Sequence, residues 1–427
     1  MTGDTIAAIA TAPGRSGVAV VRVSGEAAFE VASRVTSNAV PEPGRFALRT
    51  VRDPSRGGAP VDEALVLAFR APRSYTGEDV VEFQCHGGAV APRRVLEACF
   101  AAGARLARRG EFTERALLGG RIDYRQAESI IDLIDAKTDR AADAALAGLD
   151  GRDRRALAAL YDEALGLSAL LEHALDVDED VLTDAFREDV RRRAGGLRVR
   201  VEDCMRRARE RRILRDGALV VLAGRPNAGK SSLMNALLGE DRVLVGETPG
   251  TTRDSVEAWV DLDGWPVRLV DTAGLRASSD AVEAEGVRRA EGLVGRADIV
   301  LDLSPGAGTC AASAADVVAV HAKCDLGRGD DGVNVSVKTG EGLDDLRRAI
   351  VSRLEAKASS TAAADRAEEG LSALMDVMRS LESADWEDPV LAANAARDAA
   401  SRLGAAIGAE YAEDLLENLF SRFCVGK

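Results

Sequence analysis

Residues 219–232 read LVVLAGRPNAGKSS, and this stretch decides the fold of the central part of the chain. The apolar run at 219–223 is typical of a buried strand, and the residues after it fit the pattern G-x-x-x-x-G-K-S that opens a helix. Glycines in such a loop let backbone N–H groups surround a phosphate, while Lys230 neutralises its charge and Ser231 can bind Mg²⁺. We therefore predict a nucleotide-binding loop, whose contacting residues are Asn227, Ala228, Gly229, Lys230, Ser231 and Ser232.

Two further segments have the composition expected around a γ-phosphate. Asp271 follows the apolar run 267–270, where a carboxylate holds Mg²⁺ through water, and Gly274 can meet the γ-phosphate itself. Between the two motifs, Thr252 offers a hydroxyl to the metal. The predicted nucleotide contacts are Gly246, Glu247, Thr248, Pro249, Gly250, Thr251, Thr252, Asp271, Thr272, Ala273 and Gly274, with Ser231 and Thr252 as Mg²⁺ ligands.

The choice of guanine depends on residues 322–325, which read AKCD where the usual pattern is N-K-x-D. Asp325 can accept hydrogen bonds from both the ring N–H and the exocyclic amine of guanine, which selects against adenine. Ala322 lacks the amide that normally contacts the base, so we expect weaker binding or faster exchange of the nucleotide. The predicted base contacts are Lys323, Asp325, Ser336, Val337 and Lys338. Together these motifs predict a GTPase of the translation-factor-related class.

Hydrolysis requires a group that orients the attacking water. Leu275 stands where small signalling GTPases have a glutamine, and an apolar side chain cannot orient water. Asn227, together with the segment 246–250, is a candidate site for a monovalent cation placed where an arginine finger puts its charge. Glu283 is a candidate for organising the water; the alternative is an ordinary glutamate on a surface helix.

The pattern of residues changes several times along the chain. Residues 4–110 mix short apolar runs with turn signals and predict an α+β fold, whereas apolar residues recur at helical spacing from about 125. Between 219 and 355 strands alternate with helices, which favours a mostly parallel sheet. A linker is expected at 356–367. We therefore predict a multidomain α+β and α/β protein with domains at 1–118, 119–215, 216–356 and 357–427, the third inserted into a helical domain.

Composition excludes several classes of protein. The chain has 427 residues, 46% of them apolar, and no uncharged apolar run long enough to span a membrane. The first residues lack the features of a signal peptide, so we expect a cytoplasmic protein, and the six widely spaced cysteines indicate reduced thiols. Because the formal net charge is −14, contact with any nucleic acid, tRNA or DNA, requires a local basic patch or a partner protein.

Several short motifs outside the nucleotide site carry a family resemblance. They are DTI at 4–6, PGR at 13–15, VRVSG at 21–25, YTGED at 75–79, HGG at 86–88, GEFTERA at 110–116, QAE at 126–128 and CVGK at 424–427. With the nucleotide motifs, they make the chain resemble the MnmE (TrmE) family of tRNA modification GTPases nearly from end to end. A generic GTPase has none of these motifs, so they carry the specificity of the resemblance.

The resemblance implies an N-terminal domain that binds folate and dimerises, a discontinuous helical domain and an inserted Ras-like P-loop GTPase domain. It implies that a one-carbon unit from 5,10-methylene- or 5-formyl-tetrahydrofolate is attached to carbon 5 of the tRNA wobble uridine. The product is an aminomethyl or carboxymethylaminomethyl uridine. The implied partners are a second copy of the chain and the FAD-dependent subunit MnmG in a heterotetramer. The implied ions are K⁺ and Mg²⁺, and GTP is hydrolysed.

The resemblance also assigns individual residues. The folate contacts carried over by motif are Arg22, Glu82, Arg121 and Lys427, and the family usually has lysine where Arg121 stands. A carboxylate such as that of Glu82 suits the paired N–H donors of a pterin, whereas guanidinium groups suit carbonyl or carboxylate groups. The assigned catalytic residues are Glu283 and Cys424, and the K⁺ ligands are Asn227, Gly246, Thr248 and Thr251. For Cys424 the alternative is a packed thiol near a helix end.

Two other functions stay open. One is a GTP-dependent switch in a process such as ribosome assembly, which requires a C-terminal RNA-binding module where this sequence shows an amphipathic helix and C-V-G-K. The other is a folate-dependent aminomethyltransferase that uses the N-terminal domain alone, with a regulatory GTPase domain.

Overall fold

The computed structural model describes most of the chain. The described residues are 3–36, 39–176, 183–225, 227–239, 257–271, 292–304, 316–359, 366–383, 389–408, 420 and 423–426. The chain separates into two compact units, residues 1–131 with 410–427 and residues 132–409. None of the described helices is both long and apolar enough to cross a membrane.

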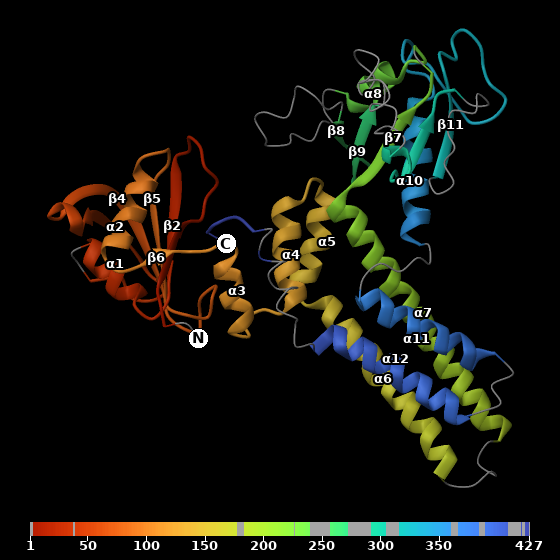
Figure 1. Ribbon diagram of the computed structural model, residues 1–427, viewed down its shortest axis with the longest axis horizontal. Coiled ribbons are helices and arrows are strands. Elements are labelled where there is room, and N and C mark those ends of the chain that lie inside the picture. The colour runs from red at the N-terminus through yellow and green to blue at the C-terminus, as the bar shows by residue number, and fades with distance from the viewer. Residues whose placement is uncertain are drawn as a thin grey trace. The chain divides into compact units, whose positions relative to one another are not determined.

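The first unit is built on a six-stranded sheet with the strand order β3-β4-β5-β2-β1-β6 (Figure 1). Neighbouring strands are antiparallel except for β1 and β6. The strands are β1 Ile6–Ile9, β2 Val18–Ser24, β3 Phe46–Asp53, β4 Ala59–Phe69, β5 Val80–His86 and β6 Arg105–Leu106. The helices are α1 Ala28–Thr36, the 3₁₀ helix η1 Pro54–Arg56, α2 Ala91–Ala101, α3 Glu111–Leu118 and α4 Tyr124–Asp135, within which the unit ends.

The two faces of this sheet have different surroundings because successive residues of a strand point to opposite sides. One face, which includes Val21 and Phe83, packs with α1 and α2 into a buried apolar core. On the other face Arg22 of β2 lies directly opposite Glu82 of β5. Phe112 of α3 packs against the β1 end of that second face. On the second face, the charged residues Arg22 and Glu82 therefore lie on the same side of the sheet as the aromatic ring of Phe112.

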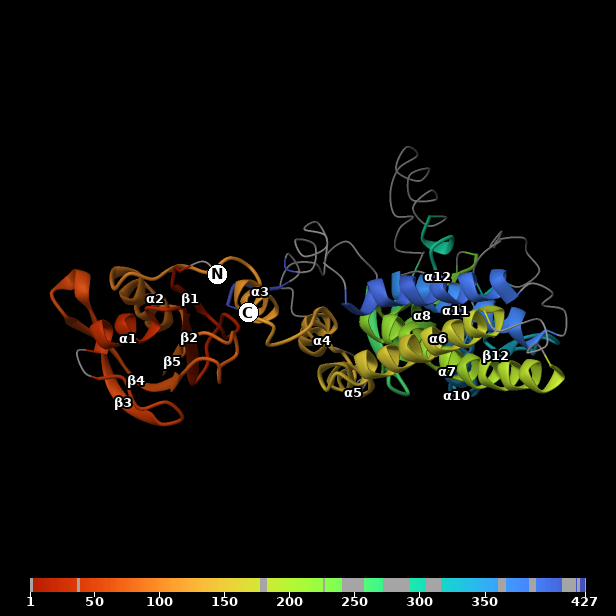
Figure 2. The same ribbon diagram turned by 90° about the horizontal axis from the view of Figure 1, so that it is seen from below.

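The second unit contains a bundle of long helices. They are α5 Asp139–Leu149, α6 Arg152–Asp176, α7 Asp184–Asp216, α11 Arg366–Glu382 and α12 Pro389–Gly408. The helices α6, α7, α11 and α12 lie side by side (Figure 2) and share an apolar core that includes Leu171, Leu197 and Leu374. In sequence, α6 and α7 precede the strands of the second sheet, and α11 and α12 follow them. The four helices nevertheless form one core, as predicted for a discontinuous helical domain.

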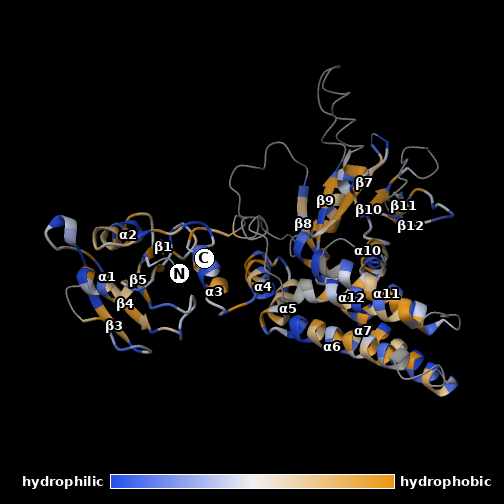
Figure 3. Ribbon diagram, turned by 60° about the horizontal axis from the view of Figure 1, so that its bottom comes forward, coloured by the Kyte–Doolittle hydropathy of each residue, from blue (hydrophilic) through white to orange (hydrophobic). Residues whose placement is uncertain are grey.

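The second sheet has the strand order β12-β11-β10-β7-β9-β8, and only β8 runs antiparallel to its neighbour. Its strands are β7 Ala218–Ala223, β8 Glu257–Leu262, β9 Trp265–Asp271, β10 Ile299–Asp302, β11 Asp316–Ala322 and β12 Val333–Val335. The accompanying helices are α8 Lys230–Leu238 and α10 Leu343–Ala358. Strand β7 is buried along its whole length, and β7 and β9 are mostly orange in Figure 3. The predicted, mostly parallel α/β sheet is confirmed.

Two details differ from the predictions made from the sequence. Strand β8 was not predicted, although Asp263-Gly264 between alternating apolar and polar residues is a signal for a two-residue hairpin turn; these two residues have φ values of 51° and 85°. A linker was also expected at 356–367, whereas α10 continues to Ala358 and α11 begins at Arg366. The helix extends because Leu354 and Ala358 both pack into the core of the second sheet.

Candidate functional site

The phosphate loop connects β7 to α8 in the second unit. Lys230 is the first residue of α8, and its buried ammonium donates to the carbonyl oxygens of Gly224 and Arg225 at 3.0 and 2.9 Å. The helix begins without a side-chain cap, and the first backbone N–H groups of a helix have no acceptor within the helix itself. Backbone amides and an ammonium therefore converge at the start of α8, which suits a phosphate group.

The serine and the aspartate expected at the Mg²⁺ site lie together. Ser231 Oγ donates to Asp271 Oδ2 at 2.5 Å, and Asp271 is the buried last residue of β9. Because β9 runs parallel to β7, with Asp271 opposite Leu222, the carboxylate emerges at the same sheet edge as the phosphate loop. A hydroxyl and a carboxylate in this position are suitable oxygen donors for Mg²⁺ beside a phosphate.

The guanine-recognition segment lies beside the phosphate loop. Asp325 follows β11, and Ser336 Oγ donates to its Oδ1 at 2.8 Å. Lys323 Nζ donates to the carbonyl oxygen of Asn227 at 3.3 Å, which joins the two loops. Ala322 is the last residue of β11. The link between the loops is therefore made by Lys323 and does not depend on an asparagine at position 322.

The remaining predicted nucleotide contacts divide into two groups. Ala228 and Gly229 lie in the loop, Ser232 lies in the first turn of α8, and Val337 and Lys338 lie on an exposed turn after β12. The residues outside the described part of the chain are Gly246–Thr252, Thr272–Gly274, Glu283 and Lys427. The expected roles of this second group in binding Mg²⁺, K⁺, water and folate stay predictions.

In the first unit, Arg22 and Glu82 form an ion pair across neighbouring strands. Arg22 Nε donates to Glu82 Oε1 at 2.7 Å, and each side chain is 17% exposed. The guanidinium also lies over the rings of Tyr75 and Phe112, 5.1 and 5.5 Å from their centroids. Within the described part of the chain, neither Oε2 of Glu82 nor the two Nη groups of Arg22 has another polar partner. These atoms are therefore open to a ligand.

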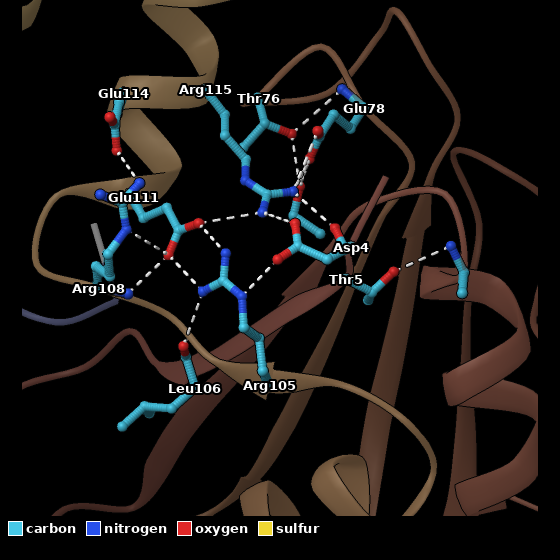
Figure 4. A network of polar contacts seen from close by, with 12 residues as sticks. Asp4, Thr5, Thr76, Glu78, Arg105, Leu106, Arg108, Glu111, Glu114 and Arg115 are labelled. Carbon is cyan, nitrogen blue, oxygen red and sulfur yellow. Dashed lines mark hydrogen bonds and ion pairs between the residues drawn. The ribbon is translucent and has the colours of Figure 1, made fainter. Parts of the chain in front are cut away.

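A buried ion-pair network lies next to this pair and is centred on Arg115, which is 8% exposed (Figure 4). Arg115 donates to Asp4 at 2.8 Å and to Glu78 and Glu111 at 3.1 Å. Arg105 donates to Asp4 and Glu111, each at 2.5 Å. The motifs DTI, YTGED and GEFTERA therefore meet in one network. No role for Arg115 was predicted from the sequence, because two of its partners lie 111 and 37 residues away along the chain.

A pocket of about 1020 Å³ lies between the loop 72–78 and α3. Tyr75, Arg73 and Arg121 line it, and Arg121 Nε donates to the carbonyl oxygen of Ser74 at 3.3 Å. The carboxylates in its wall, Glu78, Glu111 and Glu114, are all paired with arginines. Arg73 and Arg121, by contrast, have no acidic partner among the residues that the structure describes. The pocket therefore favours an anionic ligand, and it shares Tyr75 with the Arg22–Glu82 pair.

The C-terminal residues pack against this same unit. Val425 forms an antiparallel bridge with Arg109, and the Gly110 amide donates to the Cys424 carbonyl oxygen at 3.4 Å. Gly426 has a φ of 106°, and a Cβ atom there would lie 2.2 Å from the carbonyl oxygen of Ile9. Glycine is therefore required at this close approach to β1. The Cys424 thiol is exposed, as a reactive thiol must be.

The network makes the stability of the first unit depend on pH. Burial alone raises the pKa of Glu111, but hydrogen bonds from Arg105, the Arg108 amide and Arg115 outweigh it and lower the pKa from 4.5 to about 2. A carboxyl group whose pKa is lower in the folded state stabilises the fold above its unfolded pKa. This stabilisation is lost as the pH falls from about 4.5 to about 2.

We expect E111Q to lower the unfolding free energy at neutral pH by about 3 kcal/mol, because it removes the buried carboxylate that Arg105 and Arg115 share and leaves the buried Arg115 with Asp4 and Glu78 alone. It should also flatten the loss of stability on acidification. Thermal unfolding of the full chain as a function of pH measures both effects. E97Q, which breaks an exposed Arg93–Glu97 pair on α2, is the matched control and should change neither. An acid response of E111Q equal to that of the wild type would contradict this account of the network.

Comparisons with known proteins agree with this architecture. The family described as GTP-binding protein TrmE N-terminus matches residues 5–121, and the family described as MnmE helical domain matches residues 125–424. A Symbiobacterium thermophilum protein named tRNA modification GTPase MnmE is 42% identical over 467 residues and covers 100% of both chains. The Thermus thermophilus and Laribacter hongkongensis proteins of the same name are 42% and 41% identical, and each alignment covers 99% of both chains. This chain therefore belongs to the MnmE (TrmE) family of GTP-hydrolysing enzymes.

Proposed function

We propose that this protein is a potassium-stimulated GTPase that modifies the tRNA wobble uridine in the cytoplasm with a one-carbon unit from tetrahydrofolate. With an FAD-dependent partner of the MnmG type, it attaches an aminomethyl or carboxymethylaminomethyl group to carbon 5. The observation that carries the proposal is the open Arg22–Glu82 pair beside a cation-lined pocket, in a chain that also has a nucleotide site. The relatives' shared name, tRNA modification GTPase, supports tRNA as the substrate.

The residues of the first unit fit a folate. Oε2 of Glu82 can accept N–H donors from a pterin edge, and the Nη groups of Arg22 can donate to its carbonyl oxygen. Arg73 and Arg121 suit the carboxylates of a glutamyl tail, and the planar fork of Arg121 binds a carboxylate in a bidentate manner that lysine cannot. When bound, the folate supplies the one-carbon unit. We assign Lys427 as a further folate contact and Cys424 as a thiol acting in the modification step.

In the nucleotide site, Lys230 neutralises phosphate charge, Ser231 and Thr252 bind Mg²⁺, Asp271 holds that ion through water and Asp325 selects guanine. The remaining assignments are phosphate contacts for the segments 246–252 and 272–274, and base contacts for Lys323 and 336–338.

Asn227 is the proposed K⁺ ligand, with Gly246, Thr248 and Thr251. Its carbonyl oxygen accepts from Lys323, whereas its side-chain amide makes no hydrogen bond within the described residues, so the amide oxygen is available to a cation. Glu283 is assigned to the attacking water, since Leu275 cannot orient it.

An exposed apolar surface supports a homodimer formed by the proposed N-terminal domain, residues 1–118. Phe46, Leu48 and Leu65 are 70%, 60% and 38% exposed. The strand register places Phe46 in the same row as Glu82 and Arg22, on the face of the sheet that α1 and α2 leave uncovered. Clustered exposed apolar side chains mark interaction surfaces. A second copy on this face would cover them next to the folate site, and the MnmG-type subunit would complete a heterotetramer.

Glu82→Gln tests the folate site. The amide replaces an acceptor with a donor that faces the pterin N–H groups, so we expect binding of 5-formyl-tetrahydrofolate to weaken by about 2 kcal/mol, or roughly thirtyfold in Kd. Isothermal titration calorimetry of the full chain measures this change. The GTPase rate should stay unchanged, and E97Q should behave as the wild type. Equal folate affinity of E82Q and the wild type would remove Glu82 from the site.

Potassium dependence tests the nucleotide site. We expect GTP hydrolysis by the full chain to be faster in KCl than in NaCl at equal ionic strength, with no such effect on ATP. Asn227→Ala should remove the potassium response because it deletes a cation ligand, while GTP binding persists. Asn235→Ala, an exposed position of the same loop-and-helix segment, is the matched control. Equally slow hydrolysis in both salts by the wild type is the result that excludes a potassium-stimulated site.

A further inference from the structure

The β8–β9 hairpin joins two segments of the nucleotide site. β8 begins at Glu257, shortly after the segment that contains Thr252, and β9 ends at Asp271, which accepts the hydrogen bond of Ser231. β8 is paired with β9 along its whole length, from Glu257 with Val270 to Leu262 with Trp265, and Asp271 follows directly after Val270. A displacement of the hairpin as a rigid body therefore moves the Asp271 carboxylate, and β8 is joined to the Thr252 segment by only four residues of sequence.

The turn of this hairpin is bonded to the start of α5. Thr138 Oγ1 donates to the carbonyl oxygen of Gly264 at 2.8 Å. The same hydroxyl accepts from the Ala141 amide at 3.2 Å, so Thr138 is also the N-cap of α5. The Thr138 side chain therefore bonds both to the β8–β9 turn and to the first turn of α5, and fixes the position of one relative to the other.

Arg140 extends this contact to α7. Its guanidinium lies 4.1 Å from the centroid of the Trp265 ring, and its Nη2 donates to Glu210 Oε1 of α7 at 2.6 Å. Trp265 is fully buried, and its indole N–H has no hydrogen-bond partner among the described residues. The position of Trp265 is therefore set by packing and by the stacked cation, a contact that strengthens when it is shielded from water.

Trp259, the tryptophan of β8, contacts the residue that connects the end of α7 to the second sheet. Gly217 connects α7 to β7 with a φ of 73°, and a Cβ atom there would lie 2.2 Å from Cζ3 of Trp259. Lys137 Nζ lies 5.5 Å from the Trp259 ring centroid. The hairpin is thus held by both tryptophans, one on each strand, against the ends of α5 and α7.

Helix α7 connects these contacts at its C-terminal end, at Glu210 and Gly217, with the helical bundle. It has 33 residues, which gives a length of about 50 Å. Its more distant residues Val190, Ala194 and Leu197 are buried in the core shared by α6, α11 and α12. Because Val201 and Met205, which lie closer to Glu210 on α7, pack into the same core, a movement at Glu210 changes the packing of the bundle.

We propose that Arg140 is a positioning residue for GTP hydrolysis, which couples the nucleotide-dependent position of the β8–β9 hairpin to the helical bundle through Trp265 and Glu210. By linkage the coupling is reciprocal, so a partner that displaces the bundle changes nucleotide binding by the same factor. The inference depends on the GTPase activity of the family and is independent of the folate and tRNA chemistry proposed above.

Hydrogen–deuterium exchange of the full chain tests the coupling. In the wild type, the amides of α5 and of the last turns of α7 should exchange differently with GDP than with a non-hydrolysable GTP analogue. In Arg140→Ala this difference in α7 should disappear, while the analogue still binds. The kcat for GTP should fall with KM unchanged, since the contact lies away from the nucleotide.

Two further variants separate coupling from simple stability. Arg198→Ala breaks an ion pair with Glu382 that is similarly exposed and joins two helices of the bundle, so it should leave the nucleotide-dependent exchange intact. Glu210→Ala removes the acceptor of the Arg140 hydrogen bond and leaves the Arg140–Trp265 contact in place, so the exchange difference should vanish from α7 and persist in α5, even where R140A proves insoluble. A difference in α7 that survives in E210A and in soluble R140A, or a wild type without any difference, overturns the proposal.

Discussion

The buried guanidinium group of Arg115 is paired with three carboxylates, and the first unit depends on these ion pairs. Moving an unpaired charge out of water costs several kcal/mol, so the fold is stable only when Asp4, Glu78 and Glu111 reach the same place. These residues belong to the start of the chain, to the loop before β5 and to α3. The three segments therefore order together, and their positions are not independent of one another.

The geometry of the proposed folate site depends on the Arg115 ion-pair network. Phe112 follows Glu111 directly, and the Tyr75 hydroxyl is hydrogen-bonded to Thr113 of α3 at 2.7 Å. Once the network is formed, both aromatic rings are held over the Arg22 guanidinium. The stacked arginine then presents its remaining N–H groups, and its partner Glu82 presents a carboxylate oxygen, in a fixed orientation. Loss of the network would disorganise the ligand site even though Arg22 and Glu82 are unchanged. The residues of the network therefore position the site, whereas Arg22 and Glu82 bind the ligand.

Sequence reasoning succeeded where the relevant residues are close together in the chain. The strand, loop and helix around Lys230 and the carboxyl-end position of Asp271 follow from local patterns and from the parallel arrangement of strands. The Arg22–Glu82 ion pair does not, because it joins residues 60 positions apart and depends on the register of β2 with β5. The contacts of Arg140 with Trp265 and Glu210 are equally non-local. Only the Asp263-Gly264 turn carried a readable signal, and it was overlooked.

In the proposed function, one chain joins GTP hydrolysis to one-carbon chemistry on tRNA. The mass-spectrometric nucleoside content of tRNA from a strain that lacks this protein tests this function in the cell. We expect wobble uridines to lose their carbon-5 substituent, and the wild-type gene to restore it while genes encoding E82Q or Asp325→Ala do not. Fully modified wobble uridines in the deletion strain, or restoration by both variants, would contradict it.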